Sequence, residues 1–329
     1  MQEPARHEAG PLKEELDRLR QKNVWRWLLN VLTDWSVILL TFWLVVVMDT
    51  WWVYPIALII IGTRQHALGV LGHEGGHWLV SNHRALNDLL SNLLCFWPMM
   101  MILEGFRDFH YKHHQFLGTL QDPELTTKYW SAPFWDLPAS RWRIIRGVLL
   151  DLCGIGILLY KRRIMLGFLQ RKSVKGAQLA TSDFFSFWKK GGMSDAFGLG
   201  IFWVVVLGVF ASVDMLWIPI FWIIALLTSF FASFKMRVWT EHLGTTGTHR
   251  FTLPLWYRSL CLPRNIGYHY EHHLYPSVPQ WNLPALRACL HPDVPVQSLS
   301  ALFRSYADMP MTPSGKATAD SEFPPFVQG

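Results

Sequence analysis

Three short histidine clusters, separated by long stretches of sequence, constrain this chain more than any other feature. Eight of its 14 histidines lie in the windows 73–77, 110–114 and 269–273. The spacings of three and four residues within each window place side chains on one face of a helix. Histidines with only a structural role are not expected to gather three times in this way. Each window therefore predicts two or three imidazoles that point in one direction.

Eight imidazoles suit two metal ions better than one. A zinc ion takes about four ligands, and a catalytic zinc ion takes about three from the protein. Imidazole binds Zn, Cu, Fe and Ni, and the chain has no CxxC motif for a thiolate site. We therefore predict a nitrogen-rich site for two metals. The four cysteines are widely spaced, which favours reduced packing residues over disulfides: they are Cys95, Cys153, Cys261 and Cys289.

Apolar runs of about 20 residues indicate a membrane protein. The chain is 51% hydrophobic and contains 18 Trp. Asp49 and Asp214 each separate two such runs, which predicts two helical hairpins. Two shorter apolar runs are expected to be interfacial or buried rather than spanning. The predicted spans are 28–48, 51–72, 196–213 and 215–234, and the shorter runs are 89–103 and 148–160.

The three histidine windows can meet only if they lie on one side of the membrane, and two hairpins satisfy that condition. Lys and Arg gather on the same side, whereas the hairpin tips carry none. By the positive-inside rule that side is cytoplasmic. The expected fold is an all-α integral membrane protein with four transmembrane helices in two hairpins. A histidine-rich cap, the active site and both termini are expected to be cytoplasmic.

Polar residues interrupt the first hairpin at Asp34, Arg64, Gln65 and His66. Charge at that depth should face the interior of the bundle or be paired. His66 lies two turns, about 10 Å, from His73, so we expect it to form a buried hydrogen bond rather than to bind the same metal.

We expect three parts along the chain. Residues 1–23 form a polar tail with a possible short surface helix after Pro11, residues 24–305 form the membrane domain, and residues 306–329 are rich in Pro, Ser and Ala and expected to be disordered. The net charge of +6 does not indicate nucleic acid, because the basic residues flank apolar segments and no nucleic-acid-binding motif is present.

The three windows read HxxxH, HxxHH and HxxHH in this order, and each has a distinctive segment after it: 86–88, 122–123 and 274–279. In these motifs the sequence resembles the membrane fatty acid desaturase superfamily over roughly residues 55–290. That superfamily includes acyl desaturases, lipid hydroxylases and carotenoid ketolases. The boxes are specific for the superfamily but not for the reaction within it.

The resemblance implies two iron ions, O2 as cosubstrate and a lipid or acyl substrate, with no catalytic residue beyond the metal ligands. It also implies one further ligand between the last span and the third box. His242 is our candidate, with His249 or neither as the alternatives. The implied ligands are His73, His77, His110, His113, His114, His242, His269, His272 and His273.

Carboxylates near the boxes could accept a hydrogen bond from the second ring nitrogen of a metal-bound histidine. Glu74, Asp88, Asp122 and Glu271 are the candidates, although Asp122 beside Pro123 favours a capping role. If residues 265–273 are helical, Asn265 shares a face with His269 and could touch a metal-bound water. A capping or turn role for Asn265 is equally consistent with the sequence. Close backbone approach, to a metal or to a neighbouring helix, would explain Gly75 and Gly76.

Desaturation of a fatty acyl chain is the expected reaction, with hydroxylation or ketolation of a fatty acyl, sphingoid or carotenoid lipid as the alternative. The chain has no dinucleotide fingerprint, iron–sulfur cysteine set or CxxCH haem motif. A separate ferredoxin-like or cytochrome-like electron donor and its reductase are therefore expected. Basic residues in 161–175 could bind such a donor or the membrane surface.

Two other functions fit part of the pattern. His73, Glu74 and His77 form an HExxH motif typical of zinc proteases, with Glu74 as general base. An intramembrane protease would leave six box histidines unexplained. A metal transporter would require ligands within the bilayer rather than beside it.

Overall fold

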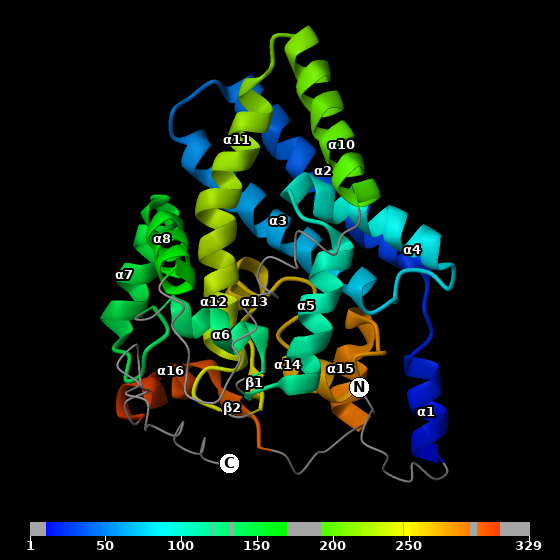
Figure 1. Cartoon of the computed structure of the whole chain (residues 1–329), viewed down its shortest axis with the longest axis vertical. Coiled ribbons are helices and arrows are strands. Elements are labelled where there is room, and N and C mark those ends of the chain that lie inside the picture. The colour runs from blue at the N-terminus through cyan, green and yellow to red at the C-terminus, as the bar shows by residue number, and fades with distance from the viewer. Residues whose placement is uncertain are drawn as a thin grey trace.

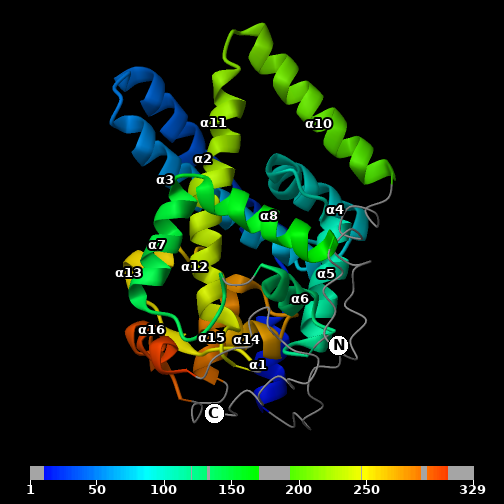
Figure 2. The same ribbon diagram turned by 60° about the vertical axis from the view of Figure 1, so that its left-hand side comes forward.

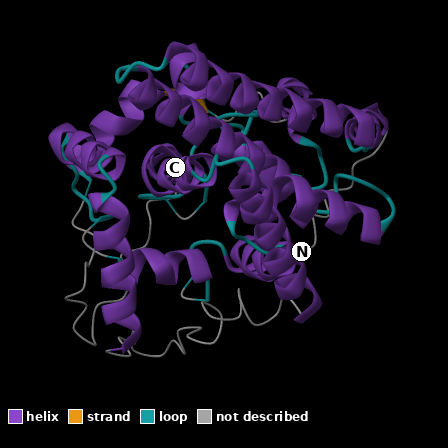
Figure 3. Ribbon diagram, turned by 90° about the horizontal axis from the view of Figure 1, so that it is seen from above, coloured by secondary structure: helices purple, strands orange, loops and turns teal. Residues whose placement is uncertain are grey.

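The computed structural model describes residues 11–119, 121–131, 134–169, 193–245, 247–289 and 295–309. Helices make up nearly all of this part of the chain (Figures 1 and 3). Two short strands, β1 (Phe251–Thr252) and β2 (Gln297–Ser298), pair in parallel. The helices are α1 (Pro11–Leu19), α2 (Val24–Met48), α3 (Val53–Gly76), α4 (Arg84–Ser91), η1 (Asn92–Phe96), η2 (Trp97–Met99), α5 (Leu103–Phe116), α6 (Pro123–Trp130), α7 (Arg141–Leu152), α8 (Ile155–Leu169), α10 (Met193–Ser212), α11 (Trp217–Ala225), η3 (Leu226–Phe230), α12 (Phe231–Glu241), α13 (Leu255–Leu260), α14 (His269–Leu274), η4 (Gln280–Asn282), α15 (Leu283–Cys289) and α16 (Leu299–Asp308).

Four helical segments of the described chain are long and apolar enough to cross a membrane, as the sequence predicts. They are Val24–Met48, Val53–Gly76, Asp195–Ser212 and Trp217–Glu241, the last made of α11, η3 and α12. In Figure 1, α10 and α11 lie at the end of the molecule away from the histidine-bearing helices, and the fourth segment continues through α12 toward them.

The shorter apolar runs have different structures from each other. Residues 84–99 and 103–116 meet at an angle of 92°, and together they are long and apolar enough for a broken span or a re-entrant loop. Residues 148–160 are not one helix, because the chain breaks between α7 and α8 at Gly154, whose φ is +74°. Glycine adopts this left-handed conformation at little steric cost.

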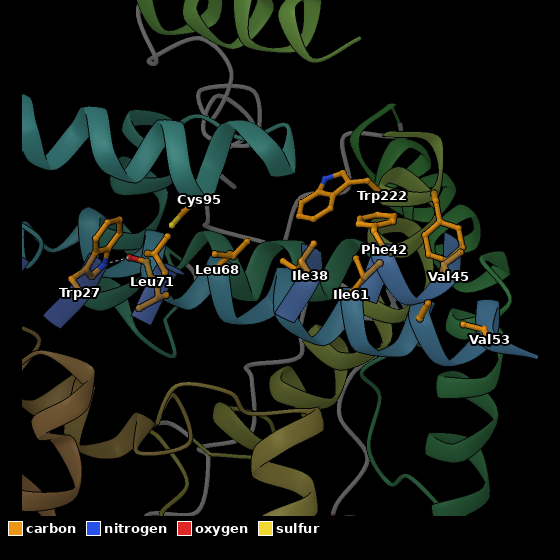
Figure 4. Packing of buried hydrophobic residues seen from close by; sticks show 14 of the residues in the cluster. Trp27, Ile38, Phe42, Val45, Val53, Ile61, Leu68, Leu71, Cys95 and Trp222 are labelled. Atoms are coloured by element: carbon orange, nitrogen blue, oxygen red, sulfur yellow. Dashed lines mark hydrogen bonds between the residues drawn. The ribbon is translucent and has the colours of Figure 1, made fainter. Parts of the chain in front are cut away.

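Helices α2 and α3 pack along their length around buried apolar side chains (Figure 4). The indole of Trp27 donates a 3.1 Å hydrogen bond to the carbonyl of Leu71, near the histidine end of α3. On the opposite side, a Cβ on Gly62 would lie 2.5 Å from the backbone nitrogen of Phe230. Small residues permit such close helix contacts, which are a main source of stability in membranes.

The polar residues of the first hairpin have buried partners, as expected. Asp34 pairs with Arg64 at 3.1 Å and with Arg264 at 2.8 Å. The amide of Gln65 donates to the Trp222 carbonyl at 2.9 Å. The Nδ1 of His66 lies 2.8 Å from the hydroxyl of Ser233, which is the predicted hydrogen-bonding role.

Glycines at the end of α3 allow neighbouring helices to approach it closely. A Cβ on Gly75 would lie 2.0 Å from the hydroxyl oxygen of Ser91, and one on Gly76 would lie 3.0 Å from the ring of Phe106. Packing against α4 and α5 therefore accounts for both glycines. The side-chain amide of Asn87 also donates to the Gly75 carbonyl at 2.9 Å.

Beneath the long helices, α1, α14, α15, α16 and the strand pair form a cap (Figures 1 and 2). Leu16 and Leu19 of α1 are buried against apolar side chains of the segment that contains α15. The proposed boundary between 305 and 306 falls inside α16, because Tyr306 is buried and donates a hydrogen bond to the Trp239 carbonyl. The rest of the tail, 310–329, lies outside the described residues.

Candidate metal centre

Four segments bring nine histidines together. His73 and His77 lie at the end of α3, and His242 is the residue at which α12 ends. Helix α5 carries the second box and α14 carries the third. All nine except the partly exposed His77 are buried.

The nine imidazoles form two groups, and within each group the ligand nitrogens lie within 4.8 Å of one another. Each group could hold a metal ion. The first, here called the five-histidine cluster, contains His73, His77, His110, His114 and His272. The second, the four-histidine cluster, contains His113, His242, His269 and His273.

Two imidazoles of each window share a cluster, as the i,i+4 spacing predicts, but the third imidazole of the second and third boxes goes to the other cluster. The second box gives His113 to one cluster and His114 to the other. Consecutive residues on a helix are separated by about 100°, so neighbouring side chains cannot share a site. The third box is divided in the same way, with His272 and His273 in different clusters.

The Nε2 atoms of the five-histidine cluster are too crowded for a hydrogen-bonded network. The Nε2 of His110 lies 2.8 Å from that of His73, 2.8 Å from that of His77 and 2.9 Å from that of His114. A ring nitrogen carries either one proton or one lone pair, so at most one of these approaches can be a hydrogen bond. A cation that accepts several lone pairs would satisfy all of them.

The four-histidine cluster has the same geometry. The Nε2 of His242 lies 3.1 Å from the Nε2 of His113 and 2.8 Å from the Nε2 of His269. The Nε2 atoms of His269 and His273 are 3.1 Å apart. Metal–nitrogen bonds of about 2.0–2.1 Å place neighbouring ligand atoms about 3 Å apart. The donor set therefore fits a metal ion.

Burial favours the neutral form of most of these imidazoles. It lowers the pKa of His269, His272 and His273 well below the ordinary value, and the neighbouring histidines lower it further. Burial also lowers the pKa of His242. At His113 burial also lowers the pKa, but the carboxylates of Glu124 and Asp122 outweigh burial and raise it. A neutral imidazole offers the lone pair that a metal requires.

Hydrogen-bond acceptors hold the second ring nitrogen of several members of the four-histidine cluster. The Nδ1 of His113 donates to Asp122 at 3.0 Å, and that of His242 donates to the Gly247 carbonyl at 2.9 Å. Asp122 also accepts a 2.9 Å hydrogen bond from the backbone N–H of Glu124, at the start of α6. It therefore combines the two roles that the sequence left open. Each of these bonds places the ring proton on Nδ1 and leaves Nε2 free for a metal.

Two further carboxylates that the sequence did not indicate lie beside this cluster. Glu241 is 3.2 Å from the Nδ1 of His269. Glu124 is 3.4 Å from the Nε2 of His113, and it pairs with Lys128 at 2.6 Å. Burial raises the pKa of Glu124, but Lys128 and His113 outweigh burial and hold that pKa below its usual range. The only local signal for Glu124 was its position two residues after Asp122.

The other candidate carboxylates position structural elements. Glu271 pairs with Arg250 at 2.8 Å and with Arg287 at 2.8 Å, which joins α14 to the segment before β1 and to α15. Glu74 accepts a 2.8 Å hydrogen bond from the backbone of Gln280. These contacts hold the third box against the first.

Asp88 acts on the first box through an arginine. It accepts a hydrogen bond from Arg107. The same guanidinium donates to the carbonyls of Gly75 and Gly76 at 3.3 Å. Asp88 thus holds in place the backbone that lies between His73 and His77.

Asn265 and His249 have partners outside the clusters. Helix α14 begins only at His269, and Asn265 precedes it with φ +60°, so the helical face assumed for Asn265 does not form. Its amide accepts from Arg258 and donates to the Gln280 carbonyl. The Nε2 of His249 lies 2.7 Å from the Leu243 carbonyl.

An apolar cavity of about 220 Å³ reaches both clusters. His73 and His110 of the first cluster and His113 and His269 of the second line it. Much of the remaining wall is aromatic or sulfur-containing and comes from η1, η2, α5, η3 and α12. Five charged side chains also line it: Glu124, Lys128, Lys235, Arg237 and Glu241. Such a cavity suits a hydrocarbon chain better than a polar substrate.

The family model for fatty acid desaturases matches residues 49–303. The chain belongs to the fatty acid desaturase family. This confirms the family suggested by the three boxes and makes the protein an oxidoreductase rather than an HExxH protease.

Several curated proteins are similar to this desaturase family member. A dihydrorhizobitoxine desaturase from Bradyrhizobium elkanii is 25% identical over 284 residues, which cover 83% of this chain and 77% of that protein. A chloroplastic omega-6 fatty acid desaturase from Glycine max is 23% identical over 301 residues, or 85% and 65% of the two chains. A ferredoxin-dependent sn-1 acyl-lipid omega-3 desaturase from Nostoc sp. (strain 36) is 27% identical over 121 residues, or 37% and 33%. The relatives agree on desaturation, while their names indicate different substrates.

Proposed function

We propose that this protein is a di-iron, O2-dependent desaturase of a lipid acyl chain, with the nine clustered histidines as the metal ligands. The observation that carries the proposal is the convergence of two imidazole clusters at one apolar cavity. Hydroxylation or ketolation of a lipid by the same site is the alternative.

The choice of iron follows from the donor set and from the reaction class. Imidazole ligands suit Fe, Cu, Zn and Ni. Zinc has no redox chemistry and cannot supply the electrons of an oxidation. Among the redox metals, iron is the one implied by the resemblance of the three boxes to the desaturase superfamily.

The overall reaction removes two hydrogen atoms from adjacent carbons of the chain. With O2, two electrons and two protons, it yields one C=C bond and two molecules of water. When bound, the two irons supply the activation of O2 for this oxidation. The electrons come from a separate donor, and the ferredoxin-dependent relative from Nostoc sp. (strain 36) supports a ferredoxin-like protein with its reductase.

The protein's own residues orient the ligands and exclude water. Asp122 and the Gly247 carbonyl accept hydrogen bonds from Nδ1 of His113 and His242, which directs Nε2 of each ring into its cluster. The ring of Phe106 stacks on His110, with centroids 5.1 Å apart, at the wall of the cavity. A water-poor pocket of this kind prevents side reactions of a strong oxidant.

Product analysis tests the reaction. The chain would be expressed in a host whose acyl lipids are saturated, and the extracted lipids would be analysed by mass spectrometry. Loss of two hydrogen atoms per acyl chain is the expected result. Gain of one oxygen atom would instead establish hydroxylation.

We propose further that the four membrane helices cross the bilayer as two hairpins, with both termini and the metal centre in the cytoplasm. The absence of Lys and Arg from the tips at Asp49 and Asp214 supports this orientation. In a cysteine-free background, cysteines at 49 and 214 should react with an impermeant label added outside intact cells. A cysteine at 161 that reacts equally well would overturn the arrangement.

A further inference from the structure

A second cavity lies on the other side of one wall of the apolar cavity. It also measures about 220 Å³, and five cationic side chains line it. Among the residues that the structure describes, none of those lining it is acidic. The cations are Arg143, Arg146, Arg162, Arg163 and Lys235, and we call this space the arginine pocket.

The two cavities share a wall only one layer of residues thick. Lys235 lines both of them. Adjacent residues of two further segments face opposite sides: Phe134 and Leu159 line the arginine pocket, whereas Trp135 and Tyr160 line the cavity at the histidines. A chain that passes Lys235 would therefore lead from the arginines to the clusters.

The arginine pocket lies at a strongly apolar surface. Its helices α7 and α8 pack together, α7 against α12 and α8 against α6 (Figure 2). Their outer faces expose Trp142 at 78%, Leu149 at 57%, Leu158 at 70% and Met165 at 52%. Helices with exposed apolar residues beside arginines are typical of the membrane interface, where lipid headgroups lie.

We propose that the arginine pocket binds the phosphate of a membrane glycerophospholipid, and that an acyl chain of the same lipid passes Lys235 to reach the histidine clusters. This inference rests on the proposed function and specifies its substrate class. It also gives a role to Arg162 and Arg163, which belong to the basic stretch 161–175. Residues 170–175 of that stretch lie outside the described residues.

The chemistry of the pocket favours a phosphate over an uncharged headgroup. Lys235 is paired with Asp151 at 3.1 Å, and Arg143 donates to the Asp136 carbonyl at 2.8 Å. We therefore assign the main recognition of the anion to the guanidiniums of Arg146 and Arg162. A guanidinium forms paired hydrogen bonds with phosphate oxygens, a geometry that lysine does not offer. The apolar floor of the pocket, which includes Ile144 and Val148, suits the glycerol and the first methylenes of the chain.

Lipid binding to the purified protein tests this proposal without any need for turnover. The probes are a fluorescent phosphatidylglycerol and a diacylglycerol with the same acyl chains and no phosphate, both in detergent micelles. The test variant carries Arg146→Gln, Arg162→Gln and Arg163→Gln. The control variant loses the same number of exposed charges elsewhere, through Arg26→Gln, Arg84→Gln and Arg304→Gln.

The test variant should bind phosphatidylglycerol at least tenfold more weakly, with unchanged binding of diacylglycerol and unchanged behaviour of the control variant. An equal loss in both variants, or no loss in either, would overturn the proposal. Palmitoyl-CoA supplies a second arm. If it loses affinity and phosphatidylglycerol does not, the phosphate belongs to a soluble thioester and the membrane source is wrong.

The same measurement separates this inference from the proposed function. If the lipid binds through the arginines but the iron-loaded protein does not desaturate it, the binding site is supported and desaturation of that lipid is contradicted. Desaturation that is insensitive to the three arginines would retain the reaction and reject the binding site.

Discussion

The two histidine clusters lie side by side, but their surroundings differ. Aromatic rings and backbone carbonyls surround the five-histidine cluster. Phe106 stacks on His110, and Arg107 holds the carbonyls of Gly75 and Gly76. Carboxylates border the four-histidine cluster instead, with Asp122 bonded to His113 and Glu241 beside His269. The first cluster has more imidazoles, and the second has more negative charge around fewer imidazoles.

This difference indicates how each site would neutralise its metal. Five neutral imidazoles would leave little room for a further ligand on an ion bound there. Four imidazoles would leave more room for another ligand. A carboxylate oxygen of Glu124 lies 3.4 Å from the Nε2 of His113, beside this cluster. A carboxylate that orients a ligand also makes the ligand nitrogen a stronger donor. The four-histidine cluster is therefore expected to depend more strongly on its acidic neighbours.

The largest effect is expected from removing a central imidazole of either cluster. His110→Ala and His269→Ala should each reduce activity by more than about 100-fold, beyond the range usual for residues that only orient a ligand. Iron content measured by inductively coupled plasma spectrometry should fall toward one ion per chain in His269→Ala, which leaves three imidazoles in its cluster. It should fall less in His110→Ala, which leaves four. His83→Ala, an exposed histidine outside both clusters, is the control. Near-normal turnover in either variant would show that the clusters do not act as one centre.

A selective effect is expected at His242, which supplies one of only four imidazoles. His242→Ala should lower iron content and activity, because three imidazoles remain in that cluster. His249→Ala should retain its iron, since the Nε2 of His249 lies beside the Leu243 carbonyl. If the two variants behave the other way round, the ninth ligand is His249.

A smaller effect should show the different dependence on carboxylates. Asparagine is also a good N-cap residue, so Asp122→Asn should preserve the start of α6 while weakening the hold on His113. We expect metal affinity or activity to fall by about 10–100-fold. Asp88 acts on the first box indirectly, through Arg107 and Asn87, so Asp88→Asn should cost less than about tenfold. Competition with a chelator measures both, and equal losses would remove the distinction between the clusters.

The sequence by itself determined the boxes, the family and the four long apolar helices. These features are local: box spacing is set by the helical repeat, and a membrane helix by a continuous apolar run. The need to bring three distant boxes together then predicted two hairpins. The pairing of Asp34 also followed, because a charge in an apolar segment requires a partner.

Only the tertiary structure decided how the nine histidines divide and which residues hold them. His113 and His114 are neighbours in sequence but belong to different clusters, because α5 lies between two groups of ligands from other helices. Glu241 faces the Nδ1 of His269 across a separation of 28 residues, and Asn265 turns away from the site with φ +60°. These contacts depend on how α5, α12 and α14 are placed relative to one another. That placement arises from packing between distant segments, which no local pattern in the sequence specifies.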